Sequence, residues 1–473
     1  MLFNTLDFGL FLVVVLALYH VLPFRAQNVL LLVASYFFYG IWDWRFAGLL
    51  LLSTTVDFFL SLALGNTEDA RRRKLLLLGS IVVNLGILGF FKYFNFFIDS
   101  ASALLLRLGL DVPDVTLRVI LPVGVSFYTF QELSYTVDVY RRELSPARNF
   151  LDFALYVSFF PQLVAGPIER ATSLLPQIQA PRPRVGWENV RSGLWLILLG
   201  TFKKVVVADS LAHLVDAVFD PAAKPVGMEV LLGAYGFAFQ CYCDFSGYSD
   251  VARGSARLLG FELMKNFDLP FIATSLRDIW AKWHISLTTW LRDYLYIPLG
   301  GNRGGRWLHY RNLILTMTIC GFWHGAAWTY VVFGFLHGVC LSIQHALRPW
   351  TERVLPKSGP ASWLWKAGGF LFAFHLWCLL ILVFRSKTVG QSWDMALTLF
   401  TDPRLGMVSA WRLPFLILIA PLVLLELWQA IRQDDEVVLR AAFPVRVLVY
   451  AVLMAGIVLL GEDHGQPFVY FQF

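Results

Sequence analysis

Residues 363–384 read WLWKAGGFLFAFHLWCLLILVF, an apolar run in which Lys366 carries the only formal charge. A helix needs roughly 20 predominantly apolar residues to cross the hydrocarbon core of a bilayer, so this run predicts a transmembrane helix. Comparable apolar runs recur along the whole sequence. They occupy residues 8–22, 28–42, 46–64, 75–98, 117–139, 151–166, 190–217, 228–260, 308–346, 412–431 and 443–461.

The composition also indicates a membrane protein. Of the 473 residues, 57% are hydrophobic and only 15% are charged, whereas soluble domains carry about 25% charged residues. We therefore predict an all-α polytopic membrane protein with about 11–12 transmembrane helices plus re-entrant helices. The run 308–346 is too long for one helix and contains several glycines, so a break is expected within it. The run 151–166 is short enough to be re-entrant.

The charged residues predict the orientation of the helices. The net charge of +6 is small and dispersed, which argues against nucleic-acid binding. The basic cluster 71–74 is expected in the cytoplasm, and the acidic segment 99–116 is expected to be an external loop. Counting three helices back from this cluster places the amino terminus outside. Basic residues at 348–357 and 432–446 are expected inside, so a last helix at 443–461 places the carboxy terminus outside as well. No basic segment precedes the run at 8–22, so we expect a retained helix and not a signal peptide.

The segment 265–306 differs from the apolar runs on both sides of it. It is rich in charged and aromatic residues, so it cannot face lipid and is expected at a cytoplasmic surface or in a water-accessible cavity. The five cysteines lie in apolar stretches without the spacing of a zinc site. We expect them to be packing residues, and we expect no bound metal.

His284 is the first candidate for chemistry. It lies in the segment 278–294, where helical spacing would place Trp280, His284 and Thr288 on one face. A histidine flanked by large rings is typical of a shaped pocket. It is equally typical of an interfacial helix anchored at the lipid headgroups, and these residues leave both interpretations open.

His324 is the second candidate, in the stretch Gly321-Phe-Trp-His324-Gly325. No acidic residue lies between positions 321 and 347, and burial disfavours the imidazolium, so a neutral imidazole able to accept a proton is expected. Ionisable residues inside a membrane are functional by default. A histidine hydrogen-bonded between helices remains the alternative. His337 is expected to be structural, and His345 to lie at the interface.

Six motifs occur in a characteristic order along the chain. They are LPVGVSFYTFQ at 121–131, FFPQLVAGPI at 159–168, CDFSGYSD at 243–250, WHISLTTWLRDY at 283–294, YIPLGG at 296–301 and WHGA at 323–326. Together they make nearly the whole chain resemble the membrane-bound O-acyltransferase (MBOAT) family, and within it the AlgI-like branch that serves polysaccharide O-acetylation. The resemblance implies one MBOAT domain over 1–473, with a catalytic core at roughly 118–346 and C-terminal helices and an aromatic tail over 363–473.

The resemblance also implies a site. A helical shell is expected around a central tunnel, in which a cytoplasmic acyl donor meets an acceptor that arrives from the opposite face. His324 corresponds to the essential histidine of the family, and His284 to the second catalytic position. The side chains expected to line the tunnel or contact substrate are Trp280, Trp283, Trp323, Asp293, Asp244 and Tyr248.

The function implied is transfer of an acetyl group, with acetyl-CoA as donor and no bound cofactor, for O-acetylation of a periplasmic or exported polysaccharide such as alginate. The resemblance implies a multi-pass protein of the bacterial inner membrane with both termini in the periplasm. The implied partner is a periplasmic SGNH-type acetyltransferase of the AlgJ/AlgX kind.

The segment 468–473, Phe468-Val-Tyr470-Phe-Gln-Phe473, resembles an aromatic motif of related acyl-transfer systems. In those systems the tyrosine is proposed to accept the acyl group, which makes Tyr470 a third catalytic candidate. An aromatic anchor at the membrane interface is the alternative. Three other functions also stay open: D-alanyl transfer of the DltB kind, transport, and a non-catalytic scaffold.

Overall fold

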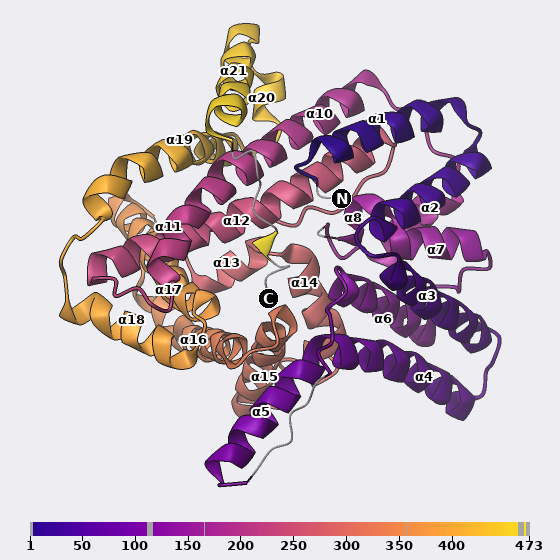
Figure 1. The fold of residues 1–473 in the computed structure, drawn as a ribbon, viewed down its shortest axis with the longest axis horizontal. Helices are drawn as coiled ribbons and strands as arrows, with labels where there is room; N and C mark the ends of the chain where they lie inside the picture. The colour runs from indigo at the N-terminus through magenta and orange to yellow at the C-terminus, as the bar shows by residue number, and fades with distance from the viewer. Residues whose placement is uncertain (1–2, 111–116, 165, 357, 462–467, 470–473) are drawn as a thin grey trace. The chain divides into compact units, whose positions relative to one another are not determined.

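The computed structural model describes residues 3–110, 117–164, 166–356, 358–461 and 468–469. Within these ranges the regular structure is helical, and no strand occurs. The chain divides into two compact units, one formed by residues 1–194 and 252–264 and the other by residues 195–251 and 265–473. Figure 1 labels the helices of both.

The first unit contains the helices from the amino-terminal part of the chain. They are α1 (Leu6–Val21), α2 (Phe24–Gly40), α3 (Trp44–Gly65), α4 (Ala70–Leu88), η1 (Gly89–Tyr93), α5 (Phe94–Arg107), α6 (Val125–Arg141), α7 (Phe150–Ser158), α8 (Phe160–Leu163) and α9 (Ala171–Gln179). Side-chain caps define some starts. Asp43 accepts a hydrogen bond from the Arg45 amide at the beginning of α3, and Asp69 accepts one from the Arg71 amide at the beginning of α4.

One expectation in this unit is wrong. The helical path that begins at Ala70 continues through η1 and α5 to Arg107, so 99–107 is helix and not loop. Alanine and leucine, which favour helix, dominate that segment. Within the basic cluster 71–74, Arg73 differs from its exposed neighbours. It is buried and donates hydrogen bonds to the backbone carbonyls of Leu64 and Tyr140.

The second unit contains most of the helices from the carboxy-terminal part of the chain. Its helices are η2 (Phe202–Ala208), α11 (Asp209–Phe219), α12 (Gly227–Leu258, with its end in the first unit), η3 (Pro270–Ile272), α13 (Leu276–Lys282), α14 (Ile285–Leu291), η4 (Arg292–Tyr296), α15 (Arg306–His324), α16 (Trp328–Val354), α17 (Pro360–Arg385), α18 (Val389–Thr401), α19 (Val408–Arg432), α20 (Val437–Arg440) and α21 (Phe443–Leu460). Helix α10 (Trp187–Thr201) crosses from one unit to the other along the chain.

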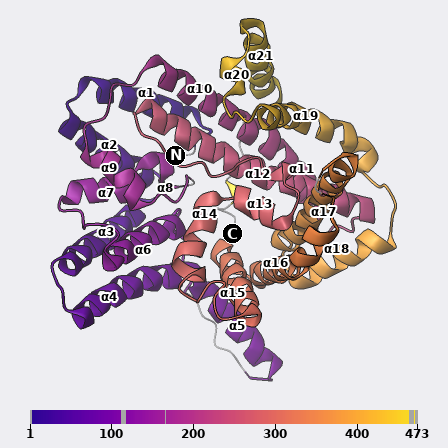
Figure 2. The same ribbon diagram turned by 180° about the vertical axis from the view of Figure 1, so that it is seen from behind.

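The long run 308–346 breaks as expected. Helix α15 ends at His324 and α16 begins at Trp328, and the two helices pack side by side in both ribbon views (Figures 1 and 2). Gly321 and Gly334 face each other where the helices meet, because a Cβ added to either would collide with the backbone of the opposite helix. This close approach places the end of α15 against α16.

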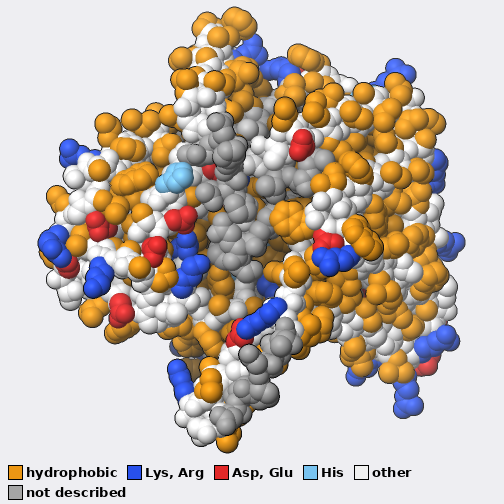
Figure 3. All heavy atoms as spheres, viewed as in Figure 1, with side chains coloured by type: hydrophobic (Ala, Val, Ile, Leu, Met, Phe, Trp, Pro, Cys, Tyr) orange, Lys and Arg blue, Asp and Glu red, His pale blue; other side chains and the backbone are white. Residues whose placement is uncertain are grey.

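Six helices among the described residues are long and apolar enough to cross a membrane. They lie at Trp44–Gly65, Ala70–Arg107, Trp328–Val354, Pro360–Arg385, Val408–Arg432 and Phe443–Leu460, and Leu6–Val21 is a shorter apolar helix. Hydrophobic side chains dominate the visible face in Figure 3, with charged side chains scattered among them. Large apolar side chains such as Leu10, Phe372 and Val458 are exposed. Such a surface fits lipid, and the chain is a polytopic membrane protein.

Candidate active site

His284 lies at a break between two short helices. Helix α13 ends at Lys282, and α14 begins at Ile285 (Figure 2). The expected continuous helical face through Trp280, His284 and Thr288 is therefore wrong. His284 has φ 44° and ψ 54°, a left-handed conformation that costs on the order of 1–3 kcal/mol for a residue other than glycine. The surrounding structure must hold it there.

Hydrogen bonds to Asn266 stabilise part of this backbone conformation. Its carbonyl accepts a hydrogen bond from the Ile285 amide at 2.9 Å. Its side-chain Oδ1 accepts from the Ser286 amide at 3.2 Å and from the Ser286 hydroxyl at 2.9 Å. Its Nδ2 donates to the hydroxyl of Ser249 on α12 at 3.3 Å. Asn266 is buried and ties the first turn of α14 to α12, so it fixes the backbone beside His284.

The His284 imidazole is fully buried among aromatic rings. Its ring centroid lies 4.6 Å from that of Phe245 and 6.5 Å from that of Phe267. Burial lowers the pKa of the His284 imidazole well below its usual range, and the neighbouring His324 lowers it further. His284 is therefore neutral, with one ring nitrogen as a donor and the other as an acceptor.

His324 is the last residue of α15 and is also buried, at 3% exposure. Its ring centroid lies 6.5 Å from that of His284, although the two residues are 40 positions apart in the sequence. The Trp323 ring contacts both imidazoles, with centroids 5.8 Å from His284 and 5.1 Å from His324. One turn earlier in α15, the Cys320 Sγ lies 3.8 Å from the His324 Nε2. The structure thus brings both candidate histidines into one buried cluster.

Trp280 and Trp283 pack in a neighbouring part of the second unit. Trp280 donates from Nε1 to the Nδ1 of His337 at 3.1 Å, which explains His337 as a buried histidine with a packing partner. Trp283 lies 4.9 Å from Trp377 between ring centroids, and both rings are buried. These contacts make a continuous aromatic wall in the second unit.

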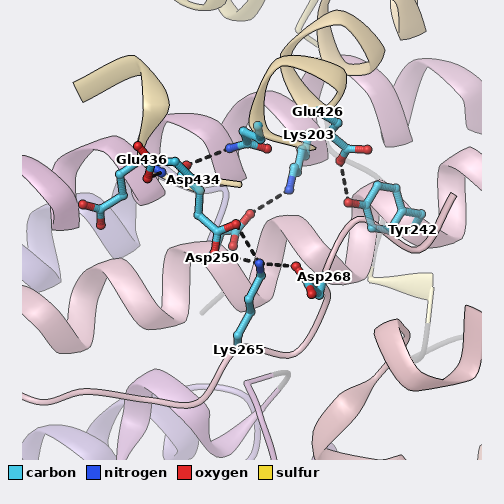
Figure 4. Close-up of polar contacts among 10 residues, drawn as sticks. Lys203, Tyr242, Asp250, Lys265, Asp268, Glu426, Asp434 and Glu436 are labelled. Atoms are coloured by element: carbon cyan, nitrogen blue, oxygen red, sulfur yellow. Dashed lines mark hydrogen bonds and ion pairs between the residues drawn. The ribbon is translucent and has the colours of Figure 1, made fainter. Parts of the chain in front are cut away.

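Buried polar contacts lie next to the Trp283 ring. The Tyr242 ring, 6.0 Å from Trp283 between centroids, carries a hydroxyl that donates to Glu426 of α19 at 2.5 Å. Lys203 of η2 forms an ion pair with Asp250 of α12 at 2.8 Å. Figure 4 shows both contacts, together with the more exposed pair of Lys265 and Asp268. These pairs hold η2, α12 and α19 together around the aromatic wall.

The remaining candidates occupy two different places. Asp293 forms an ion pair with its neighbour Arg292 at 2.7 Å and is partly exposed. Asp244 and Tyr248 lie on α12 against the segment Phe468–Val469: Asp244 accepts from the Val469 amide, and the Tyr248 and Phe468 rings lie 4.6 Å apart between centroids. Tyr470 lies outside the described residues.

Some residues of the site carry signals that sequence reasoning passed over. Lys203 and Lys204 are adjacent cations inside the apolar run 190–217, and such cations require buried partners. Asn266 gave no such signal, because its role depends on contacts with α12 and α14. Among the described residues, no three histidine, cysteine or acidic side chains could hold a metal ion together.

Fold and site together define an all-helical, polytopic membrane protein with two neutral-capable imidazoles buried in an aromatic cluster. The sequence model of the membrane-bound O-acyltransferase (MBOAT) family matches residues 115–385, which include both histidines. The chain belongs to this family and is an O-acyltransferase.

Relatives extend the similarity beyond that region. A probable alginate O-acetylase AlgI of Azotobacter vinelandii is 42% identical over 83% of this chain and 76% of the relative. A probable alginate O-acetylase AlgI of Pseudomonas putida is 37% identical over 98% of both chains. A peptidoglycan O-acetyltransferase of Helicobacter pylori is 38% identical over 73% of this chain and 71% of the relative.

Proposed function

We propose that this protein takes an acetyl group from cytoplasmic acetyl-CoA and passes it through the inner membrane for O-acetylation of an exported polysaccharide. The observation that carries the proposal is the pairing of His284 and His324 in one buried cluster. The names of the relatives support acetyl as the acyl group and a polysaccharide such as alginate as the acceptor.

His324 acts as the general base in this proposal. An acceptor O–H gives its proton to the imidazole as the oxygen attacks the thioester carbonyl. The C–S bond then breaks, and the coenzyme A sulfur leaves and takes the proton back from His324. General-base help of this kind contributes roughly 10²–10⁴ in rate. A buried, neutral imidazole is the form that can accept the proton.

His284 stabilises the charge that develops on the carbonyl oxygen. A neutral imidazole has one N–H donor, and a donor in a site from which water is excluded stabilises an oxyanion strongly. The rigid backbone at His284, held by Asn266, keeps this donor in place without reorganisation during the reaction. Trp280, Trp283 and Trp323 form the wall of a tunnel through which donor and acceptor reach the histidines.

Tyr470 is the proposed acceptor of the first transfer. Its phenol oxygen receives the acetyl group as an ester and hands it to a periplasmic SGNH-type acetyltransferase, which acetylates the polymer. Support comes from the residues just before it. Phe468 and Val469 are buried, and the Phe468 ring lies 5.6 Å from Phe245, the same ring that packs on His284. Both ends of the chain face the periplasm in this arrangement.

The test uses the purified protein in proteoliposomes with acetyl-labelled acetyl-CoA. Label is expected on the peptide that contains Tyr470, and it should disappear in Tyr470→Phe and in His324→Ala. A D-alanyl thioester of a carrier protein serves as the competing donor. Labelling by that donor alone would replace acetyl transfer with D-alanyl transfer. In a second reaction that also contains the polysaccharide and the periplasmic acetyltransferase, continued transfer to the polymer by Tyr470→Phe would exclude the tyrosyl ester.

A further inference from the structure

A buried ionic cluster lies under the segment Phe468–Val469. The Lys204 Nζ lies 2.8 Å from the Asp244 Oδ1 and 2.8 Å from the Asp209 Oδ1. The three side chains are exposed by only 1–2%. One ammonium group thus contacts two buried carboxyl groups. Buried charge is costly unless further donors reach the carboxylate oxygens.

The segment Phe468–Val469 supplies one such donor. The Val469 amide donates to the Asp244 Oδ2 at 2.6 Å, while the Asp244 Oδ1 faces Lys204. Phe468 is fully buried between the Phe245 and Tyr248 rings of the same helix, at 5.6 Å and 4.6 Å between centroids. A charge-assisted hydrogen bond to a main-chain amide, next to an aromatic contact, fixes the register of the segment on the helix that it contacts.

We propose that Asp244, held in place by Lys204, is a positioning residue that docks the segment Phe468–Val469 on α12 beside the histidine cluster. Because the bond uses the main-chain amide, it sets the register of the chain independently of the side chain at 469. The docking itself does not depend on the reaction. Only the role of the docked segment in acetyl transfer rests on the proposed function.

The docking arm of the test measures hydrogen exchange of the Val469 amide in the full chain in nanodiscs. Asp244→Ala removes the acceptor, and the amide is expected to exchange at least tenfold faster than in the wild type. Asp250→Ala is the matched control, because Asp250 lies on the same helix and pairs with a different lysine, Lys203. Its Val469 amide should stay protected. Equal protection in Asp244→Ala and the wild type would overturn the proposal.

Val469→Pro gives a second arm that leaves the ionic cluster intact, in case Asp244→Ala fails to fold. Proline has no amide hydrogen, so the bond to Asp244 is lost, whereas Val469→Ala keeps it. A photoreactive phenylalanine analogue at position 468 should cross-link to α12 in Val469→Ala and lose at least nine-tenths of this cross-link in Val469→Pro. An equal cross-link in both would overturn the docking.

The positioning role is read from the kinetics of acetyl transfer. Val469→Pro is expected to lower kcat at least tenfold with the KM for acetyl-CoA unchanged, because donor binding does not involve the segment. Docking lost with kcat unchanged would overturn the positioning role and leave the proposed function standing. The opposite combination is also informative. If docking behaves as expected but His324→Ala keeps full transfer activity, the proposed function is refuted and the docking stands.

Discussion

His284, at the break between α13 and α14, and His324, at the end of α15, lie 6.5 Å apart between ring centroids within one aromatic cluster. Trp323 contacts both rings, so the two imidazoles share one wall. This relationship combines two motifs that are widely separated in the sequence into a single site.

Asn266→Ala should lower acyl transfer by about 10- to 100-fold, because small displacements of a catalytic group have effects of that size. The substitution removes the acceptor for the Ser286 amide and hydroxyl and frees the backbone at His284. Ser286→Ala removes only the hydroxyl and should retain activity within about threefold. Steady-state transfer assays on the two variants check the difference. Equal losses in both would mean that Asn266 does not position His284.

Trp280→Phe should destabilise the protein more than it affects transfer. It leaves the buried His337 Nδ1 without the donor that it has now, at a cost of about 1–3 kcal/mol. The double variant Trp280→Phe with His337→Leu removes both partners and should recover part of the loss. Thermal unfolding in detergent measures all three. An additive loss in the double variant would contradict a direct Trp280–His337 interaction.

Cys320→Ala should keep transfer within about threefold of the wild type, because a thiol is a weak donor and the contact with His324 Nε2 is long, at 3.8 Å. The same variant tests covalent catalysis by the thiol. Loss of transfer together with a trapped acyl thioester on Cys320 in the wild type would assign the nucleophile to cysteine, contrary to our account.

Stability should fall as the pH drops below about 6.5, the ordinary pKa of histidine. The folded-state pKa of His284 is depressed by burial, so the unfolded chain binds a proton there that the folded chain does not. The free energy of unfolding therefore rises with pH through this range, by at most about 1.4 kcal/mol per pH unit for one histidine. Between pH 5 and 8, the free energy of unfolding of His284→Gln should rise less steeply with pH than that of the wild type. An unchanged slope would mean that His284 titrates alike in both states.

The sequence predicts local features of this fold well. The run 363–384 becomes Pro360–Arg385, and 443–461 becomes Phe443–Leu460. The break between α15 and α16 falls in a glycine-containing stretch of a run too long for one helix. Hydropathy and glycine content act within one segment, so the residues themselves carry the information.

The parts that sequence analysis missed depend on partners far along the chain. The break at His284 exists because Asn266 binds the first turn of α14, and no periodicity within 278–294 indicates it. Asp244 and Tyr248 were predicted to line the substrate path, but their contacts with Val469 and Phe468, more than 200 residues further along the chain, are not indicated by the motif around them. The pairing of Lys204 with two carboxylates on neighbouring helices is likewise a tertiary feature.

The central claim is that His324 is the general base. The measurement that tests it most directly is single-turnover acetyl transfer from labelled acetyl-CoA by reconstituted His324→Ala, compared with His375→Ala. His375 lies in α17 of the same unit and is exposed, with a hydrogen bond to Tyr235. We predict a loss of roughly 10²–10⁴ in rate for His324→Ala, an unchanged thermal unfolding profile, and near-normal transfer by His375→Ala. Transfer by correctly folded His324→Ala at the wild-type rate would contradict the account.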